Sequence, residues 1–421
     1  MDINQLLKGV RCDCGKTHTC DIEYVYIEKN AIRRLEEICR KNRRILIVAD
    51  ENTFAAAGEK TLAALGGKDI QKVIFSGGEI LVPNEAAIGE VESRLENVDL
   101  LVGIGSGVIQ DLCKYVSFSG GVPYIIVATA PSMDGYASNG AAMITGGMKV
   151  TYPAGLPVAI VADTEVIRNA PIEMLKAGYG DIIGKFSALN DWKLSHLITG
   201  EYFCPYIYDL TYEQIQKTLS LAGGILAREE ESIKALMEAL IIIGILMSFA
   251  GSSRPASGSE HHLSHFFEIT GILDGKPYFP HGIDVAYSTV ITAKLREKLL
   301  SRPFPAAIFR RSPEEYAKTM VKIYKSAADG CIALQKKTGN YTTHRAYLQK
   351  EDGIRAILAQ MPTGEEIAQM LSLVDLDMAD FYRLYGEETI ENAILYGKDL
   401  KDRYTVLWLY YDFYGGEACV Q

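Results

Sequence analysis

Four of the seven histidines lie in one short stretch, as His261, His262, His265 and His281. Histidine is the commonest metal ligand, and His261 and His265, four positions apart, share one face of a helix. Metal catalysis needs about three protein ligands and an open position, so a carboxylate should join the histidines. The best candidate is Asp181, which follows a glycine near the start of a helical pattern, although an aspartate there can also be only a helix cap. The stretch therefore predicts a divalent-metal site.

A glycine-rich segment, Gly103–Asp111 (GIGSGVIQD), follows an apolar run and opens a helical pattern. Glycines let the backbone approach a ligand, and the amides at a helix N-terminus attract a pyrophosphate. The spacing departs from GxGxxG because Val108 occupies the last glycine position. Asp50 and residues 76–79 (SGGE) end other apolar runs, and open α/β sheets bind ligands at such carboxyl ends. We interpret the segment as a dinucleotide loop with Asp50 at the adenosine ribose; a tight turn without ligand is the alternative.

The segment Thr129–Ser138 (TAPSMDGYAS) ends another apolar run. It combines three aliphatic hydroxyl side chains, those of Thr129, Ser132 and Ser138, with the carboxylate of Asp134, which suits a site that orients a polar ligand. An ordinary polar loop in which Asp134 caps a turn is the alternative interpretation.

A cysteine cluster near the N-terminus contains Cys12, Cys14, His18 and Cys20. These side chains could bind a structural metal, but the CxC spacing is not the usual CxxC, and reduced surface thiols are the default interpretation. The remaining cysteines are scattered among apolar neighbours, as is typical of a reduced cytosolic core.

The order of apolar runs predicts the elements that position these side chains. Five short runs read as strands of a parallel sheet covered on both faces: Ile45–Ala49, Lys72–Phe75, Leu100–Ile104, Tyr124–Ala128 and Pro157–Val161. A hairpin is expected at residues 141–152. Long helical patterns then follow: Ile172–Thr199, Tyr212–Ala250, Pro313–Thr338, Glu365–Val374 and Ile390–Trp408. We therefore predict two domains, an α/β dinucleotide-binding domain at 1–165 and an all-α domain at 166–421.

Composition excludes several classes of protein. A formal charge of -10 argues against a nucleic-acid partner, since such binding depends on clustered lysine and arginine. The most apolar window, Ala239–Phe249, is about half the roughly 20 residues that span a bilayer, so we expect a buried helix and no membrane partner. No apolar run of signal-peptide length opens the chain, and we expect a cytoplasmic protein.

Five blocks, taken together and in order, resemble the sn-glycerol-1-phosphate dehydrogenases, especially the bacterial branch. The blocks are GSGVIQD, TAPSMDGYAS, GDIIGKFSALNDWKLS, SSRPASGSEHHLSHFFE and PHGIDVAYST. These enzymes are related to glycerol dehydrogenase, iron-type alcohol dehydrogenases and dehydroquinate synthase. The resemblance implies their fold, a Rossmann-like N-terminal domain followed by a helical C-terminal domain.

The resemblance also implies roles for particular residues. The pyrophosphate loop falls on Gly105, Ser106, Gly107, Val108 and Ile109, with Asp111 beside it. The nicotinamide half would be contacted by Thr129, Ser132 and Ser138, and the substrate hydroxyls by Asp134. The metal ligands would be Asp181, His261 and His281, with His265 left to contact substrate or relay a proton. Two departures bear on these roles: His262 adjoins His261, and Ile283 and Asp284 stand where many relatives have Glu.

The implied reaction is reduction of dihydroxyacetone phosphate to sn-glycerol 1-phosphate by NADH or NADPH, with a zinc, nickel or iron ion as Lewis acid. Arg254 is our candidate for the substrate phosphate, and Lys185 is the second. The resemblance further implies a homodimer or larger homo-oligomer. An unphosphorylated-polyol dehydrogenase and a dehydroquinate synthase-like cyclase are the alternative activities.

Overall fold

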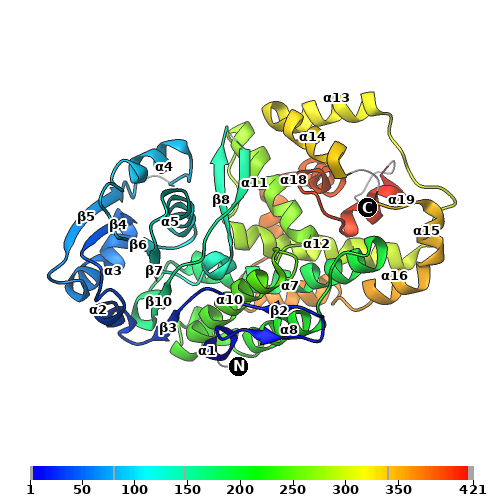
Figure 1. The fold of residues 1–421 in the computed structure, drawn as a ribbon. Coiled ribbons are helices and arrows are strands. Elements are labelled where there is room, and N and C mark those ends of the chain that lie inside the picture. The colour runs from blue at the N-terminus through cyan, green and yellow to red at the C-terminus, as the bar shows by residue number, and fades with distance from the viewer. Residues whose placement is uncertain (1–2, 79–80, 147, 339–340, 416–421) are drawn as a thin grey trace. The chain divides into compact units, whose positions relative to one another are not determined.

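The computed structural model describes residues 3–78, 81–146, 148–338 and 341–415, and the chain forms two compact units (Figure 1). Unit 1 comprises Met1–Tyr179 and Gln216–Ser253, and unit 2 comprises Gly180–Ile215 and Arg254–Gln421. Among the described residues every strand precedes Thr164, as the sequence predicted. The compact unit nevertheless extends past residue 165, because a later helical segment also packs within unit 1.

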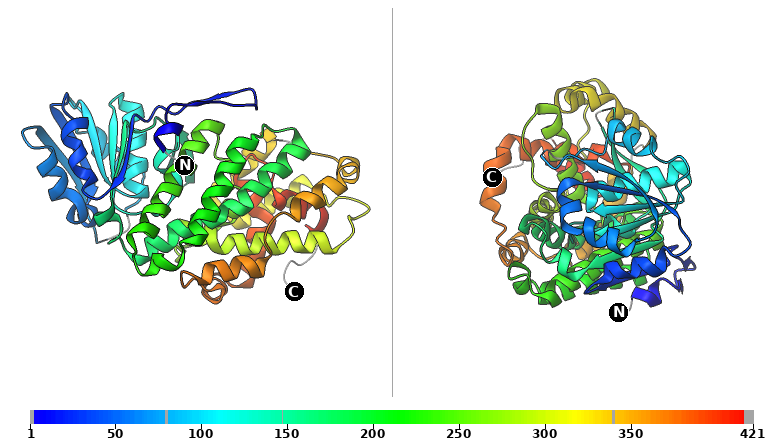
Figure 2. Two further views of the ribbon diagram at one scale, coloured as in Figure 1. Left: turned by 90° about the horizontal axis from the view of Figure 1, so that it is seen from below. Right: turned by 90° about the vertical axis from the view of Figure 1, so that its left-hand side faces the viewer.

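Unit 1 is built on a six-stranded parallel sheet (Figure 2). The strand order is β3-β10-β7-β6-β4-β5. The strands are β3 (Tyr24–Glu28), β4 (Arg44–Asp50), β5 (Asp69–Phe75), β6 (Leu100–Gly105), β7 (Tyr124–Ala128) and β10 (Ala159–Asp163). β6, β7 and β10 are buried along their whole length, as expected for parallel strands covered on both faces. The five strands predicted from the sequence are confirmed, and β3 was missed.

The helices lie on both faces of this sheet, and the point where the chain changes from one face to the other indicates where a ligand binds. α3 (Glu51–Ala64) packs on one face, and α4 (Glu85–Glu92) and α5 (Gly107–Gly120) pack on the other. The chain leaves β4 toward β5 on one side and returns to β6 on the other side. The strand order therefore reverses between β4 and β6, and ligands bind at the carboxyl ends of strands beside such a switch point.

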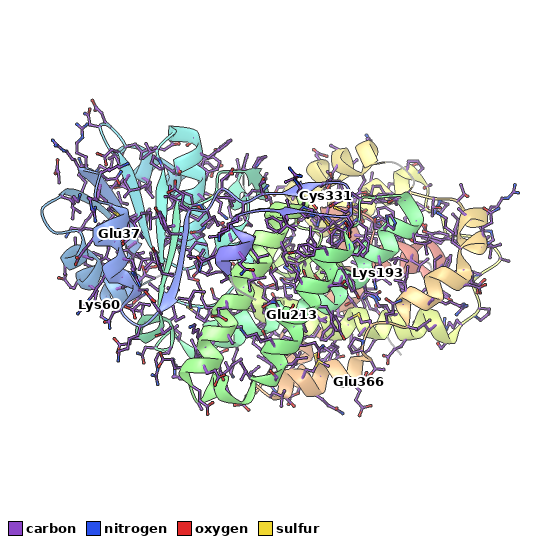
Figure 3. All side chains as sticks on the ribbon, turned by 60° about the horizontal axis from the view of Figure 1, so that its bottom comes forward. Glu37, Lys60, Lys193, Glu213, Cys331 and Glu366 are labelled. Atoms are coloured by element: carbon purple, nitrogen blue, oxygen red, sulfur yellow. The ribbon has the colours of Figure 1, made fainter. Side chains whose placement is uncertain are left out.

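Smaller elements complete unit 1. The predicted hairpin forms as β8 (Gly140–Thr145) and β9 (Met148–Pro153), with Gly146 in the left-handed conformation at φ 58°. Residue 147 and Glu79, which the sequence analysis also named, lie outside the described residues. The other elements are β1 (Val10–Arg11), β2 (Thr17–His18), α1 (Ile3–Leu6), η1 (Ala31–Arg34), α2 (Leu35–Ile38), η2 (Asp134–Ala137), α6 (Thr164–Ile167), α9 (Gly223–Leu226) and α10 (Glu230–Ala250). Charged side chains such as those of Glu37 and Lys60 project from its surface (Figure 3).

α10 contains the most apolar segment of the chain. By length and composition it is the single helix within the described residues that could cross a membrane, yet 83% of its apolar window is buried inside the structure. That burial is what the core helix of a folded domain shows, in agreement with the expectation of a buried helix.

Unit 2 is helical in its described part. α7 (Ile172–Thr199) and α8 (Pro205–Ser220) each extend from one unit's residues into the other's. The remaining elements are α11 (Ser259–Asp274), α12 (His281–Ser301), α13 (Pro313–Tyr324), η3 (Lys325–Ala327), α14 (Ala328–Thr338), α15 (His344–Gln349), α16 (Glu351–Leu358), α17 (Gly364–Ser372), α18 (Met378–Tyr396), η4 (Gly397–Leu400) and α19 (Val406–Tyr414). The central elements for function are α7, α11 and α12, because they carry the predicted metal ligands.

Candidate functional site

Three helices of unit 2 bring the predicted metal ligands together. Asp181 lies on α7, His261 on α11 and His281 at the first position of α12, and their donor atoms all lie within 4.8 Å of one another. Nε2 of His261 is 3.6 Å from Oδ1 of Asp181. Oxygen and nitrogen ligands at 2.0–2.2 Å from a tetrahedral zinc are roughly 3.4 Å apart. The three side chains can therefore share one cation.

Close packing of α7 on α12 makes this convergence possible. A Cβ atom added at Gly180 would lie 2.4 Å from the carbonyl oxygen of Gly282, and one added at Gly184 would lie 2.5 Å from Cγ1 of Val285. Both glycines thus let the backbone of α7 approach the first turns of α12. Asp181, beside Gly180, lies in the interior of α7, so the alternative role of helix cap is excluded.

A second carboxylate orients the ligand His261. Oε1 of Glu260 lies 2.7 Å from Nδ1 of His261, inside a fully buried pair. A metal-bound histidine typically donates its other ring N–H to such a carboxylate, which fixes the tautomer and directs Nε2 to the ion. Oγ of Ser264 lies 3.4 Å from Nδ1 of His281. Glu260 was missed in the sequence analysis, although its position next to the histidine pair was a usable signal.

The buried charges of the site compensate one another. Burial alone would raise the pKa of Asp181, but the positive charges of Lys185 and of the neighbouring imidazoles outweigh it and hold that pKa below its usual value. Nζ of Lys185 lies 2.5 Å from Oδ1 of Asp181, and both side chains are fully buried. Burial likewise acts to raise the pKa of Glu260, but the hydrogen bond and charge of His261 and further hydrogen bonds together outweigh it, so this pKa is also lowered. Both carboxyl groups are therefore ionised, as metal binding requires.

The other histidines of the stretch have separate positions. His262 is fully buried, and burial lowers its pKa well below the usual value, so its imidazole is a neutral core group. The cluster of side chains that could hold an ion contains His261 and not His262. The half-buried ring of His265 lies 5.6 Å from that of His281, beside the cluster. Asp284 is buried and accepts a hydrogen bond from the hydroxyl of Tyr385 at 2.7 Å, so it is a core residue.

Arg254 does not have the surroundings of a phosphate ligand. Its guanidinium is 2% exposed and binds both carboxylate oxygens of Glu201, at 2.7 and 2.5 Å. It also donates to Oγ of Ser195 and to the carbonyl of Tyr404, each at 3.0 Å. The role proposed for Arg254 from position alone is therefore corrected to a structural one. The second candidate, Lys185, forms a buried ion pair with Asp181.

Replacing Arg254 with alanine should destabilise the fold by about 3 kcal/mol, because it leaves the mostly buried Glu201 carboxylate without its partner. The Michaelis constant for substrate should stay unchanged. Urea denaturation measures the first effect and steady-state kinetics the second. The control is Arg383→Ala, which removes an exposed pair with Asp380 and should cost under about 1 kcal/mol. An unchanged stability for Arg254→Ala would contradict the structural role.

The predicted dinucleotide loop lies at the carboxyl end of β6 in unit 1. Gly105 ends the strand, and a Cβ added there would lie 2.5 Å from Cβ of Ile109, so the turn into α5 needs glycine. Ser106 is the N-cap residue of α5, which leaves the first amides of the helix directed at this edge. Oγ of Ser106 lies 2.5 Å from Oγ of Ser132, and Thr129 N–H donates to the carbonyl of Gly105 at 3.0 Å. The two predicted segments therefore meet at one edge of the sheet.

A buried lysine organises the second of these segments. Nζ of Lys114 donates to the carbonyls of Gly135 and Gly140, at 2.8 and 2.9 Å, and to Oγ of Ser138 at 3.2 Å. Burial lowers its pKa. Lys114 thus shapes the loop that holds Asp134 and Ser138. It was missed because a lysine inside a helical pattern is ordinarily a surface residue.

Asp50 flanks the same edge. It ends β4, whose residue Ala49 pairs with Ile104 of β6, so Asp50 lies across from the glycine loop at the switch point. Its Oδ1 accepts the N–H of Thr53 at 2.8 Å, in a capping box that begins α3.

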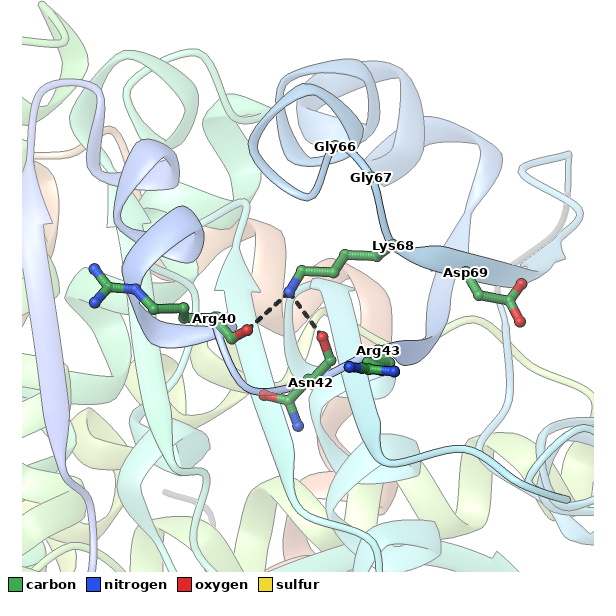
Figure 4. Close-up of a pocket in the computed structure, with 7 residues that line it drawn as sticks. All are labelled: Arg40, Asn42, Arg43, Gly66, Gly67, Lys68 and Asp69. Atoms are coloured by element: carbon green, nitrogen blue, oxygen red, sulfur yellow. Dashed lines mark hydrogen bonds between the residues drawn. The ribbon is translucent and has the colours of Figure 1, made fainter.

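A surface pocket elsewhere in unit 1 carries no comparable chemistry. It lies at the amino ends of β4 and β5, where Nζ of Lys68 donates to the carbonyls of Arg40 and Asn42, at 3.2 and 2.7 Å (Figure 4). Open α/β sheets bind ligands at the opposite, carboxyl edge. We therefore take the carboxyl edge of unit 1 and the three-ligand cluster of unit 2 as the functional centres.

Comparison with known proteins relates the chain to a group of dehydrogenases. Residues 26–171 match the family model described as iron-containing alcohol dehydrogenase. The chain is 36% identical to a glycerol-1-phosphate dehydrogenase using NAD(P)+ from Halalkalibacterium halodurans, a match that covers 70% of this chain and 77% of the relative. It is 30% identical to the enzyme of that name from Geobacillus stearothermophilus, over 96% and 98% of the two chains.

Solved structures share the fold. An iron-containing alcohol dehydrogenase from Thermococcus thioreducens has a TM-score of 0.61 at 16% identity and covers 95% of this chain and 100% of its own. A glycerol dehydrogenase from Schizosaccharomyces pombe has a TM-score of 0.54 at 18% identity, with 86% and 91% covered. At these identities the likeness confirms the predicted fold, a Rossmann-like domain followed by a helical domain.

Proposed function

Because the chain belongs to the glycerol-1-phosphate dehydrogenase family, we propose that it reduces dihydroxyacetone phosphate to sn-glycerol 1-phosphate with NADH or NADPH, assisted by a divalent metal. The observation that carries the proposal is the buried cluster of Asp181, His261 and His281, with Glu260 orienting His261. One carboxylate and two imidazoles suit zinc, nickel or iron. When bound, the cation supplies Lewis-acid polarisation of a ketone and the nicotinamide supplies the hydride.

The residues of unit 2 have distinct tasks in this proposal. Asp181, His261 and His281 hold the ion and leave a coordination position for substrate oxygen. Glu260 keeps the proton on Nδ1 of His261, so that Nε2 remains a ligand throughout turnover. Lys185 balances the charge of Asp181 in the dry interior. The half-buried His265 relays the proton that the reduced substrate takes up.

The residues of unit 1 bind and orient the cofactor. The amides of Gly107, Val108 and Ile109 face the pyrophosphate at the N-terminus of α5. Gly105 and Ser106 complete this pyrophosphate loop. The residues of the second segment, Thr129, Ser132 and Ser138, contact the nicotinamide half, and Asp134 contacts substrate hydroxyls. The proposal further includes a cytoplasmic enzyme that acts as a homodimer or larger homo-oligomer, which light scattering would test.

The decisive assay is anaerobic incubation of the metal-loaded protein with dihydroxyacetone phosphate and NADH. We expect net NADH oxidation and a product that sn-glycerol-3-phosphate dehydrogenase does not reoxidise. Faster turnover of unphosphorylated dihydroxyacetone would indicate a glycerol-type dehydrogenase. No net oxidation would contradict the proposal and favour a cyclase that uses its nucleotide only transiently.

Replacing Asp50 with asparagine should raise the ratio of kcat/KM for NADPH to that for NADH by about tenfold, because a carboxylate at the ribose repels a 2'-phosphate. Asparagine caps a helix as well as aspartate does, so α3 should be unaffected. The control is Asp69→Asn, an exposed aspartate at the opposite edge of the sheet. An unchanged ratio would place Asp50 away from the ribose.

A further inference from the structure

We infer that Cys12, Cys14 and His18 form a second metal site in unit 1, which binds zinc and serves the structure rather than the reaction. Their sulfur and nitrogen atoms lie within 4.8 Å of one another. This inference does not depend on the proposed function. It rests on four features of the β1–β2 hairpin and its surroundings.

The distance between two of the ligand atoms is the one that a zinc ion imposes. Sγ of Cys14 lies 3.5 Å from Nε2 of His18. With Zn–S near 2.3 Å and Zn–N near 2.0–2.1 Å, a tetrahedral angle places the two ligand atoms about 3.5 Å apart. These two ligand atoms therefore already have the separation that a shared zinc ion requires.

The orientation of His18 is fixed from its far side. Its Nδ1 lies 3.1 Å from the carbonyl oxygen of Phe249, and the ring is 1% exposed and stacks on the Phe249 ring at 5.3 Å. A carbonyl can only accept, so Nδ1 carries the proton and donates it. The lone pair of Nε2 then faces the thiols, which is the arrangement of metal-bound histidines. A histidine that served only as core packing would not need Nε2 directed at two sulfur atoms.

The turn of the hairpin explains the unusual CxC spacing. The N–H of Gly15 donates to the carbonyl of Cys12 at 3.0 Å, and the N–H of Cys12 donates to the carbonyl of Lys16 at 3.1 Å. Gly15 has φ 85°, a left-handed conformation that residues with a Cβ rarely adopt. The chain thus reverses directly after Cys14 and returns His18 to the two cysteines.

Cys20, which the sequence analysis grouped with these residues, has a different environment. It is buried and lies outside the cluster of described ligand atoms. The structural-metal hypothesis is therefore kept for Cys12, Cys14 and His18 and dropped for Cys20.

Zinc is the cation that this donor set favours, because thiolate and imidazole together are typical of structural zinc sites. β1 and β2 have only two residues each, and so short a hairpin has little stability of its own. An ion held by Cys12, Cys14 and His18 would anchor the hairpin to α10, through the contact of His18 with Phe249. The site thus stabilises the packing of the β1–β2 hairpin on α10 within unit 1.

The test is elemental analysis of the purified full-length protein, supported by cobalt substitution. We expect two bound divalent ions per chain in the wild type, and one in Cys12→Ser/Cys14→Ser. The double variant should also lose the thiolate-to-cobalt charge-transfer band, which the oxygen and nitrogen ligands of unit 2 cannot produce. Conversely, His261→Ala should retain that band and one ion, so failure of either site is seen separately.

The matched control is Cys20→Ser, which removes a thiol of the same segment and should keep both ions. His18→Asn gives a second, independent variant that should also bind one ion. A wild-type protein with a single ion and no charge-transfer band would overturn the inference. So would a double variant that retains two ions.

Discussion

Replacing His261 with alanine is expected to lower kcat/KM by at least about a thousandfold and to remove one bound metal ion. A Lewis-acid metal contributes several kcal/mol to transition-state stabilisation, and about 4 kcal/mol corresponds to a factor of a thousand. The loss should be larger than for any change outside the cluster, because Asp181 and His281 alone make an incomplete site. Metal analysis and steady-state kinetics with dihydroxyacetone phosphate measure the two effects.

His262→Ala is the matched control for this prediction. The neighbouring imidazole is buried in the core of unit 2 and lies outside the ligand cluster. Its removal should reduce the free energy of unfolding by forming a cavity, while metal content per folded chain stays the same. If His261→Ala kept its ion and its rate after metal stripping and readdition, the assignment of the ligands would be wrong.

Glu260→Gln should weaken metal binding by about 10–100-fold, the usual effect of removing a group that orients a ligand. Glutamine has nearly the same shape but no charge, so Nδ1 of His261 loses the strong acceptor that lies 2.7 Å away. The effect should appear as a higher dissociation constant in titrations with Zn²⁺. At saturating metal the rate should recover further than it does for His261→Ala.

A glutamate on the same helix provides the comparison. Glu268→Gln changes a half-buried side chain of α11 away from the ligand cluster and should leave metal affinity unchanged. Equal metal affinity in Glu260→Gln and the wild type would show that Glu260 has no part in ordering the site.

Much of the fold could be predicted because its signals are local. Continuous aliphatic runs such as residues 45–49 need burial on both faces, and this alone predicted the strands of the parallel sheet. α7 was predicted with the bounds that the structure has, Ile172–Thr199. The predicted helix Tyr212–Ala250 is instead broken into α8, α9 and α10, with Arg228 at φ 57° in the intervening turn. Apolar periodicity does not detect such a turn.

Site residues whose roles depend on distant partners were harder to predict. Glu260 acts through its neighbour His261, and Lys114 through carbonyls more than twenty residues away. The error on Arg254 has the same origin. The position of Arg254 just before the histidine-bearing helix suggested a phosphate ligand. Its actual partner, Glu201, lies 53 residues away in the sequence and leaves no local signal near Arg254. Charge pairing through space is thus the part of the site that a single sequence does not reveal.

The two glycines that let α7 pack against α12 would also limit the size of the ion that the proposed metal site accepts. Gly180 and Gly184 fix the separation of the helices that carry Asp181 and His281. Zinc takes its ligands at about 2.0–2.2 Å, and calcium at 2.3–2.6 Å with six to eight oxygens. Any side chain at these glycines would push α7 and α12 apart. The distance between Asp181 and His281 would then increase and favour larger ions. At the proposed site, metal selectivity would then depend partly on two residues that lie outside the ligand cluster.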